Sequence, residues 1–415
     1  MTPQRRISMT GKLAERGLHR LLSLLARDGE QALIVGGAVR NSLLGLPVDD
    51  VDIATSLEPN VVIDRLTNAG MRYVPTGLEH GTVTVLVDDH KYEVTTFRED
   101  IETDGRHATV RFGRDLTRDA ERRDFTINAL YADASGFVLD PVGGMDDLVA
   151  RRVRFIGDPR TRIREDYLRS LRFFRFTARY SKDETDTDAL TAIDAEREGL
   201  ATLSRERVRT EILKLIDAPR AVYVLRIMAH RGLVEPVFGV PLDLDGLSRM
   251  LIRDPGADAM LRIAALTIHK PDDAMTLRTM LRLSNPETER LSKLGQVLMQ
   301  LSALPRPLNP KEIRKIAFRV GRRATTDALV IDAGRRDVKV ASELWLAAGS
   351  APTHSPFTGA ALIKRGIAAG PLVGTIIRHA ETAWADADFP SDPESLRSLM
   401  AEAITRYSGP VQTES

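Results

Sequence analysis

The stretch that most constrains the fold lies near the N-terminus, where an apolar segment runs into two glycines. Residues 32–35 read Ala-Leu-Ile-Val, and Gly36 and Gly37 follow directly. This pattern predicts a strand, a tight turn and a short helix that carries Arg40. Glycine lets the backbone come close to a phosphate, and a helix start presents free N–H groups to it. The order of these elements predicts an α+β domain with a triphosphate site.

A pair of carboxylates follows after a turn at Gly45 and Pro47. Asp50 and Asp52 are two residues apart, so in a strand they share one face. Two hard oxygen ligands on one face can bind magnesium, and such ions can activate a hydroxyl and neutralise a leaving pyrophosphate. Alone, the glycine pair is typical of a tight turn, and the Asp-x-Asp pair is typical of a solvated strand edge. In this order and spacing they favour metal-dependent nucleotidyl transfer.

The composition is that of a folded protein without redox chemistry in its side chains. The chain has 415 residues, 43% of them hydrophobic, and no cysteine, which excludes a disulfide framework and a thiolate metal site. No segment has the uninterrupted apolar length of a membrane span. Residues 1–10 are basic without an apolar stretch behind them, so we expect no secretory signal and a cytoplasmic location. A net charge of +1 does not indicate RNA binding by itself.

Three further strings carry groups suited to nucleotides. Residues 91–98 read as a strand and contain Glu93. Residues 122–130, Arg-Arg-Asp-Phe-Thr-Ile-Asn-Ala-Leu, offer guanidinium donors for phosphate, a carboxylate for ribose hydroxyls and an amide. Residues 164–169 open a helix that we expect to continue to about Tyr180.

Together these strings resemble the tRNA nucleotidyltransferase and poly(A) polymerase family, which includes the bacterial CCA-adding enzymes. The resemblance is strong from residue 30 to about 217, and one departure is Asn41, where the family usually has Asp. It implies a class II nucleotidyltransferase fold: a mixed-sheet catalytic head followed by an elongated all-helical neck, body and tail. A helix at residues 203–213, opened by Ser204, is expected to brace the nucleotide-binding helix.

The resemblance also implies roles for individual residues. The catalytic carboxylates are Asp50, Asp52 and Glu93, and the first two hold Mg²⁺. The nucleotide-binding residues are Gly36, Gly37, Arg40, Arg123, Asp124, Asn128, Glu165, Asp166 and Arg169. The partners are tRNA, CTP and ATP, with neither DNA nor a membrane expected.

Asp166 and Arg169 are expected to choose the incoming base. A carboxylate accepts from the exocyclic amine of cytosine or adenine, and a guanidinium donates to the adjacent ring nitrogen or carbonyl. Uracil and guanine present a carbonyl and a ring N–H at this edge, which reverses the donors and acceptors. One Asp/Arg pair can therefore accept CTP and ATP and refuse UTP and GTP. The alternative is a surface ion pair between positions i and i+3 of a helix.

A basic stretch from Arg306 to Arg323 is a candidate for binding the RNA backbone. Its expected RNA-binding residues are Lys311, Arg314, Lys315, Arg319, Arg322 and Arg323. On a helix, several of these could follow a row of phosphates. An ordinary solvated helix face is an equal alternative.

The pattern changes from short strands to helices after about residue 160. We expect an N-terminal helix at 1–29, a catalytic head at 30–152, a neck with the base-reading helix at 153–238, a tRNA-binding body at 239–345 and a tail at 346–415 with a disordered end. The charged, Gly-containing segment from Glu99 to Glu121 is expected to be a loop, flexible in CCA-adding relatives.

The expected reaction is template-independent addition of CCA to the 3′ end of tRNA, with release of pyrophosphate. A poly(A) polymerase, or an enzyme that adds only CC or A, would share nearly all these motifs. The presence of Asp50, Asp52 and Glu93 argues against a catalytically inactive RNA-binding relative. A metabolite or antibiotic nucleotidyltransferase should lack the base-reading helix and the long helical half.

Overall fold

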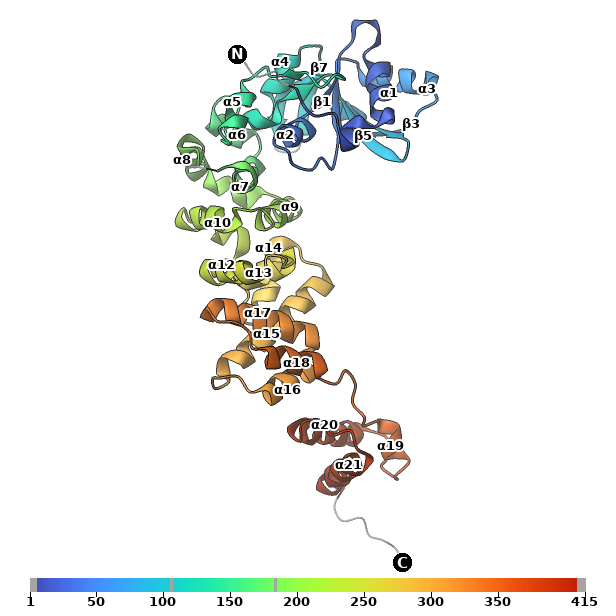
Figure 1. The fold of residues 1–415 in the computed structure, drawn as a ribbon, viewed down its shortest axis with the longest axis vertical. Helices are drawn as coiled ribbons and strands as arrows, with labels where there is room; N and C mark the ends of the chain where they lie inside the picture. Colours follow the sequence, from blue (N-terminus) through green and yellow to red (C-terminus); the bar gives the residue numbers. More distant parts are fainter. Residues whose placement is uncertain (1–5, 105–106, 183–184, 409–415) are drawn as a thin grey trace, which may run out of the picture. The chain divides into compact units, whose positions relative to one another are not determined.

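A computed structural model describes residues 6–104, 107–182 and 185–408 of the chain. The chain forms two compact units, Met1–Pro236 and Val237–Ser415, and each is described by itself. The first contains a mixed sheet followed by helices, and the second is helical where the structure describes it (Figure 1). The predicted succession of a mixed-sheet head and an all-helical remainder is confirmed.

Seven strands form the sheet of the head, in the order β3-β4-β5-β2-β1-β8-β9. Their bounds are β1 Ala32–Val35, β2 Asp52–Thr55, β3 Arg72–Gly77, β4 Thr82–Val87, β5 His90–Thr96, β8 Tyr131–Ala132 and β9 Val138–Leu139. β2 and β5 run parallel, and the other neighbouring pairs are antiparallel.

The head contains short helices before, between and after the strands. They are η1 Gly11–Ala14, α1 Arg16–Leu25, η2 Arg27–Gly29, α2 Gly37–Leu43, α3 Pro59–Asn68, η3 Leu78–His80, α4 Leu116–Glu121, η4 Thr126–Asn128 and α5 Gly144–Val149. α1 and α3 cover one face of the sheet. The side chains that β4 and β5 point toward this covered face are buried. A second apolar cluster, which includes Phe97 and Tyr131, covers the other face over β1 and β2.

The described part of the N-terminal segment contains the helix α1 and packs onto the head. Arg6 forms a β-bridge with Phe137, and the N–H of Ile7 donates to the carbonyl of Gly136 over 2.9 Å. α1 buries Leu18, Leu21, Leu22 and Leu25 completely or nearly so. Its amphipathic leucines therefore complete the core of the sheet.

The segment expected to be a loop, Glu99 to Glu121, is mostly regular structure. β6 Arg98–Asp104 pairs with β7 His107–Phe112 as an antiparallel hairpin, and α4 follows. Residues 105–106 lie outside the described residues. The charge and glycine content of the segment had favoured a loop over this two-stranded ribbon.

The remaining helices of the first unit follow the sheet. They are α6 Pro159–Glu165, α7 Leu168–Tyr180, α8 Thr187–Ala195, η5 Arg197–Thr202, α9 Arg205–Ile216, α10 Ala221–His230 and α11 Glu235–Phe238, which extends across the unit boundary. The helix expected to begin at Arg164 is instead two helices. The chain breaks at Asp166, whose extended backbone has φ −156° and ψ 105°.

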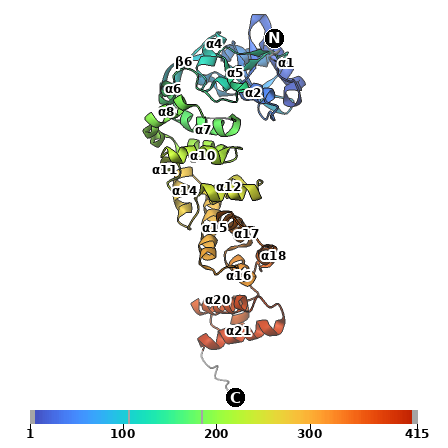
Figure 2. The same ribbon diagram turned by 60° about the vertical axis from the view of Figure 1, so that its left-hand side comes forward.

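The second unit is built from packed helices (Figure 2). They are α12 Leu244–Arg253, α13 Ala259–Thr267, α14 Asp273–Leu281, α15 Asn285–Ala303, α16 Pro310–Val320, α17 Arg322–Arg336, α18 Ser342–Ser350, α19 Gly359–Ile363, α20 Pro371–Asp386 and α21 Pro393–Ser408. An aromatic cluster joins α16 to α20 and its following turn: Trp384 lies 5.5 Å from Phe318 and 4.9 Å from Phe389 between ring centroids. The expected disordered end falls mainly on residues 409–415, which lie outside the described residues.

Candidate active site

Two of the expected catalytic carboxylates lie side by side on adjacent strands. Asp52 is the first residue of β2, and it lies directly opposite Glu93 of the parallel strand β5. Residues directly opposite on neighbouring strands point to the same face of a sheet. Asp50 lies just before β2, in the connection from α2, and its side chain is exposed.

The electrostatics of these carboxylates fit a cation. Partial desolvation raises the pKa of Asp52, and the negative charges of Glu93 and Asp50 raise it further. Crowded carboxylates of this kind are relieved by a bound divalent ion. Glu93 also forms an ion pair with Lys91, whose Nζ lies 3.2 Å from its Oε1. In the described part of the chain no three acidic or histidine side chains are already gathered as one metal-ligand group.

The glycine turn lies beside this carboxylate row. Gly36 follows β1 and precedes α2, with φ 68°, a conformation that a residue with a side chain rarely adopts. A Cβ on Gly36 would lie 3.8 Å from Nη1 of Arg123. The turn therefore brings backbone and guanidinium close together.

Arg123 is held in place by two groups that the sequence did not single out. Its Nη2 donates to Asp119 over 3.1 Å, and its Nε donates to the Tyr131 hydroxyl over 3.0 Å. Asp119 is 1% exposed and also accepts from Arg122. Burial alone would raise the pKa of Asp119, but Arg122 and Arg123 lower it more.

Arg40 was expected to bind phosphate, but its guanidinium points into the protein. It is 6% exposed, its Nη2 donates to the Tyr180 hydroxyl over 2.6 Å, and its Nη1 donates to the side-chain oxygen of Asn128. The guanidinium also lies 4.1 Å from the centre of the Tyr180 ring. Asn41, which stands where the family usually has Asp, accepts from Nη2 over 3.1 Å. Arg40 thus ties the glycine turn to α7.

Asp124 and Asn128 continue this buried network. Asp124 accepts from Nδ2 of Asn128 over 2.8 Å and from Nε of Arg172 over 2.7 Å. Burial alone would raise the pKa of Asp124, but Arg172 and these hydrogen bonds lower it more. Arg172 lies on α7, so the carboxylate expected near the ribose is anchored to the base-reading helix.

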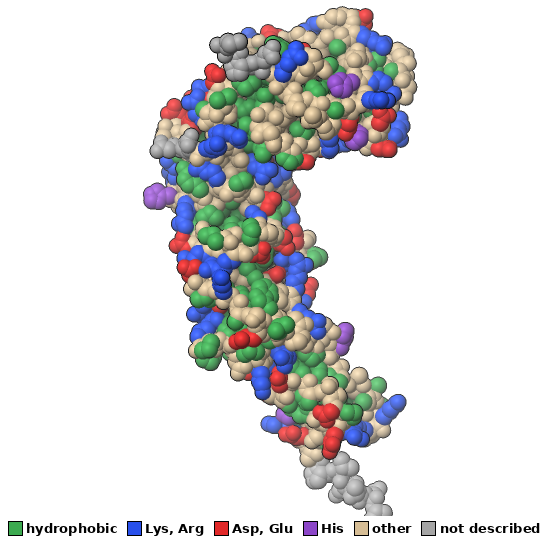
Figure 3. Space-filling view, in the orientation of Figure 1, with side chains coloured by type: hydrophobic (Ala, Val, Ile, Leu, Met, Phe, Trp, Pro, Cys, Tyr) green, Lys and Arg blue, Asp and Glu red, His purple; other side chains and the backbone are tan. Residues whose placement is uncertain are grey.

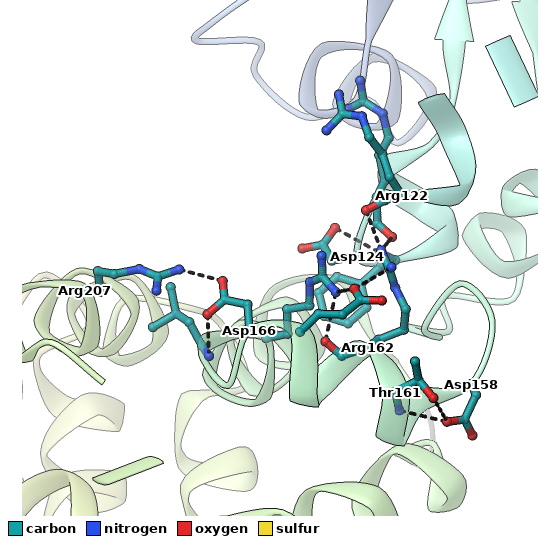
Figure 4. Close-up of polar contacts among 12 residues, drawn as sticks. Arg122, Asp124, Asp158, Thr161, Arg162, Asp166 and Arg207 are labelled. Atoms are coloured by element: carbon teal, nitrogen blue, oxygen red, sulfur yellow. Dashed lines mark hydrogen bonds and ion pairs between the residues drawn. The ribbon is translucent and has the colours of Figure 1, made fainter. Parts of the chain in front are cut away.

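The expected base-reading residues do not pair with each other. Asp166 accepts from Arg207 of α9 over 2.6 Å, and its other oxygen accepts from the N–H of Leu168 over 3.1 Å (Figure 4). Arg169 donates to Glu165 and to the carbonyl of Arg162. Asp166 therefore hydrogen-bonds to the first residue of α7, and the i and i+3 surface pair is not formed.

Arg162 ties the base-reading residues to the Arg-Arg-Asp string. Its guanidinium donates to Glu165 over 2.6 Å and to the carbonyl of Arg123 over 2.7 Å (Figure 4). The helix that contains Arg162 is itself capped by Asp158, which accepts from the N–H of Thr161 over 2.8 Å. Base-reading and phosphate-binding candidates thus share one rigid support.

Sequence reasoning missed five residues of this site: Asp119, Tyr131, Arg172, Tyr180 and Arg207. Asp119 had a usable signal, because it lies four residues before Arg123 and such residues face each other on a helix. Tyr180 and Arg207 had none, since their partners are 140 and 41 residues away in the chain.

The cations expected to bind RNA mostly have carboxylate or carbonyl partners within the second unit. Arg314 pairs with Asp388 over 2.5 Å, and Lys315 lies 2.9 Å from Glu312 and 2.9 Å from Asp386. Arg322 donates to the carbonyl of Ala351, and Arg323 lies 3.2 Å from Asp258; Lys311 and Arg319 are exposed. Figure 3 shows basic and acidic side chains intermixed over these helices.

The combined geometry defines a class of protein. A mixed sheet that carries adjacent carboxylates, a glycine turn at the end of the neighbouring strand and a guanidinium over that turn can bind a triphosphate next to a metal. This is the arrangement of a nucleotidyltransferase. No helix among residues 6–104, 107–182 and 185–408 is long and apolar enough to cross a membrane.

Comparisons with known proteins show which kind of nucleotidyltransferase this chain resembles. Residues 32–154 match the family model of the poly A polymerase head domain, and residues 185–242 match that of a probable RNA- and SrmB-binding site of polymerase A. The chain is 31% identical over 394 residues to the mitochondrial CCA tRNA nucleotidyltransferase 1 of Mus musculus, covering 92% of this chain and 89% of that protein. It is 31% identical to a CCA-adding enzyme of Streptococcus gordonii, over 92% of this chain and 96% of that protein.

A solved structure gives the same result. The Bacillus stearothermophilus CCA-adding enzyme in complex with CTP superposes with a TM-score of 0.75 at 27% identity, over 95% of this chain and 98% of that one. The chain belongs to the tRNA nucleotidyltransferase and poly(A) polymerase family, in the branch of the CCA-adding enzymes. It is an enzyme of nucleotidyl transfer, and enzymes of this family use a divalent metal ion.

Proposed function

We propose that this enzyme adds CCA to the 3′ end of tRNA from CTP and ATP, in the cytoplasm, with Mg²⁺ as its metal. The observation that carries the proposal is the pairing of Asp52 with Glu93 beside the Gly36 turn and Arg123. A hydroxyl, a metal and a triphosphate can meet at this point. Membership of the CCA-adding branch supplies the substrates.

Asp50 and Asp52 would hold Mg²⁺, and Glu93 would support it or help to deprotonate the attacking hydroxyl. When bound, the ion supplies a positive charge that activates the hydroxyl and neutralises the leaving pyrophosphate. The protein residues do the positioning. The Gly36–Gly37 turn admits the triphosphate, and Arg123 donates to its oxygens from a guanidinium already fixed by Asp119 and Tyr131.

Asp166 and Arg169 would read the base from the start of α7. Both side chains are mostly buried, at 18% and 13% exposed, so a wrong base would leave a charged group poorly paired. Arg207 holds one oxygen of Asp166 and leaves the carboxylate with capacity to accept from an amine. Glu165 performs the same holding role for Arg169.

Arg40, Asp124 and Asn128 would act together on the sugar and phosphate side. Arg40 positions the glycine turn through its bonds to Asn128 and Tyr180, and it does so without facing the phosphate itself. Asp124 and Asn128 lie where the head meets α7, and there they would face the sugar of a nucleotide whose base contacts Asp166.

One assay tests this function. The purified protein is incubated with labelled tRNA lacking its terminus and with CTP, ATP or both. We expect two additions with CTP alone and a third only when ATP is also present. A long A tract from ATP would instead identify a poly(A) polymerase, and arrest after CC or addition of A alone would identify a partial enzyme.

A further inference from the structure

One face of the head's sheet, the open face, carries exposed side chains on β3 and β5. Between them on β4, Thr84 is 4% exposed, and its hydroxyl lies 2.8 Å from that of Thr76. Along β5 the side chains of Tyr92 and Val94 are buried against the covered face, whereas Lys91 is 59% and Glu93 50% exposed. The alternation shows that α1 and α3 cover one face and leave side chains of β5 and β3 accessible on the other.

This open face continues the catalytic row. The residues opposite one another across β1, β2, β5, β4 and β3 are Val35, Asp52, Glu93, Thr84 and Val74. The adjacent row on the same face contains Lys91, Leu86 and Arg72. Side chains directly opposite one another share a face, so Lys91 and Arg72 project on the side of the carboxylates.

The open face carries two exposed cations and an exposed apolar side chain. Nζ of Lys91 lies 3.2 Å from Glu93, while Arg72 lies two strands farther, at about 10 Å by strand spacing. Val74 is 45% exposed, and Thr76 beside it is also exposed. Cations spaced along a surface with apolar contact area suit a single-stranded nucleic acid.

The geometry of the reaction indicates which substrate group approaches over this face. In phosphoryl transfer the attacking and leaving oxygens lie roughly in line on opposite sides of phosphorus. The Gly36 turn and Arg123, which would hold the leaving pyrophosphate, are at the end of β1, on one side of Asp52. Glu93 is on the other side, so the attacking hydroxyl must arrive over β5, β4 and β3.

We propose that Arg72, Val74, Thr76 and Lys91 form the binding surface for the 3′-terminal nucleotides of the acceptor RNA. Lys91 and Arg72 contact backbone phosphates, and the 3′ hydroxyl enters the site from the Glu93 side. The inference rests on the proposed function, because it takes an RNA hydroxyl as the attacking group.

The first test uses Lys91→Gln and Arg72→Gln in the full-length protein. Each should raise the KM for tRNA lacking CCA by roughly fivefold and flatten the salt dependence of RNA binding by about 0.7 in logarithmic slope. The KM for CTP should not change. Arg20→Gln is the matched control: Arg20 is 62% exposed on α1, which covers the opposite face, and this variant should behave as wild type.

The second test changes the RNA. With a primer whose last two linkages are neutral methylphosphonates, Lys91→Gln and wild type should have the same KM, and Lys91→Arg should behave as wild type on ordinary RNA. An unchanged KM for RNA in both Gln variants, or a raised KM for CTP, overturns the inference while wild type still adds CCA. A wild-type protein that adds nothing to tRNA overturns the proposed function itself.

Discussion

The two compact units use their basic residues differently. In the first, Arg123 is 19% exposed and Asp119, its partner, 1%, so the guanidinium is fixed by a buried carboxylate. In the second, Arg314 and Asp388 are 28% and 26% exposed, and Lys315 pairs with Asp386, which is 59% exposed. A partner at the surface contributes little to stability, whereas breaking a buried pair is costly.

This difference suggests two modes of contact with phosphate. A guanidinium locked by Asp119 and Tyr131 presents its remaining donors in one geometry, as catalysis at a single phosphorus requires. Cations that share exposed carboxylates can exchange them for a phosphate at small cost, as binding to a long backbone requires. The following predictions test the comparison, from the largest effect to the smallest.

Asp52→Asn should lower nucleotide addition by about a thousandfold or more, because the metal's charge stabilisation depends on this carboxylate. Binding of tRNA should remain close to wild type. The matched control in the second unit is Asp386→Asn, which removes one exposed carboxylate beside Lys315 and should leave the rate unchanged. Addition rates and a tRNA binding isotherm are measured on the same preparations; substantial activity in Asp52→Asn contradicts the metal assignment.

Trp384→Ala should destabilise the second unit by about 3–5 kcal/mol, since it removes a buried ring packed edge-on against Phe318 and Phe389. The other tryptophan of the chain, Trp345, is 41% exposed, and Trp345→Ala should cost far less. Urea unfolding followed by far-UV circular dichroism compares the two. Equal losses would show that the aromatic cluster does not hold α16 against α20.

Asp119→Asn should destabilise the first unit by roughly 3 kcal/mol at neutral pH, because it leaves Arg122 and Arg123 without their buried partner. The folded-state pKa of Asp119 is below its unfolded value, so its stabilisation is present above the unfolded pKa and lost as pH falls through the folded one. The variant should therefore show a flatter decline of stability on the acid side.

The control for this prediction is Asp88→Asn, whose side chain is 61% exposed. Its unfolding free energy should follow wild type from pH 7 down to acid. If Asp119→Asn also follows wild type, the buried cluster does not contribute to stability as argued.

Asp166→Ala should reduce the preference for CTP over UTP by about tenfold, because the amine of cytosine loses its acceptor and uracil no longer meets a carboxylate. Asp188→Ala, at an exposed position of α8, is the control. Catalytic efficiency is measured for all four nucleotides. A lower overall rate with an unchanged CTP-to-UTP ratio would leave Asp166 only a structural role, as the hydrogen-bond partner of Leu168 and Arg207.

Lys311→Gln with Arg319→Gln should flatten the salt dependence of tRNA binding by roughly one unit of slope per lost contact. Arg314→Gln with Lys315→Gln should flatten it less, because these cations already share carboxylates. Equal changes for both pairs would show that the surface ion pairs open freely on binding. No change in either would leave α16 as a solvated helix face.

Several elements of the head were predictable because their causes are local. The apolar run before Gly36, the left-handed glycine and the short helix with Arg40 follow from neighbours in the chain, and β1 and α2 have the predicted positions. The resemblance to a known family named Asp50, Asp52 and Glu93 together. The strand face expected to join Asp50 to Asp52 is not formed, because Asp50 lies before β2, and Asp52 shares its face with Glu93 of β5. The sequence did not reveal the break between α6 and α7 at Asp166. Residues 164–180 have the pattern of one helix, whereas the contact of Asp166 with Arg207 depends on tertiary structure.

The sequence by itself determined the strand–turn–helix unit, the order of motifs and the change to helices, since these depend on side chains a few residues apart. Tertiary structure decided which charges meet. Arg40 turns inward to Tyr180, Asp124 binds Arg172, and Arg314 binds Asp388, 74 residues away. A buried charge takes whichever opposite charge the packing brings near, and that choice depends on the fold as a whole.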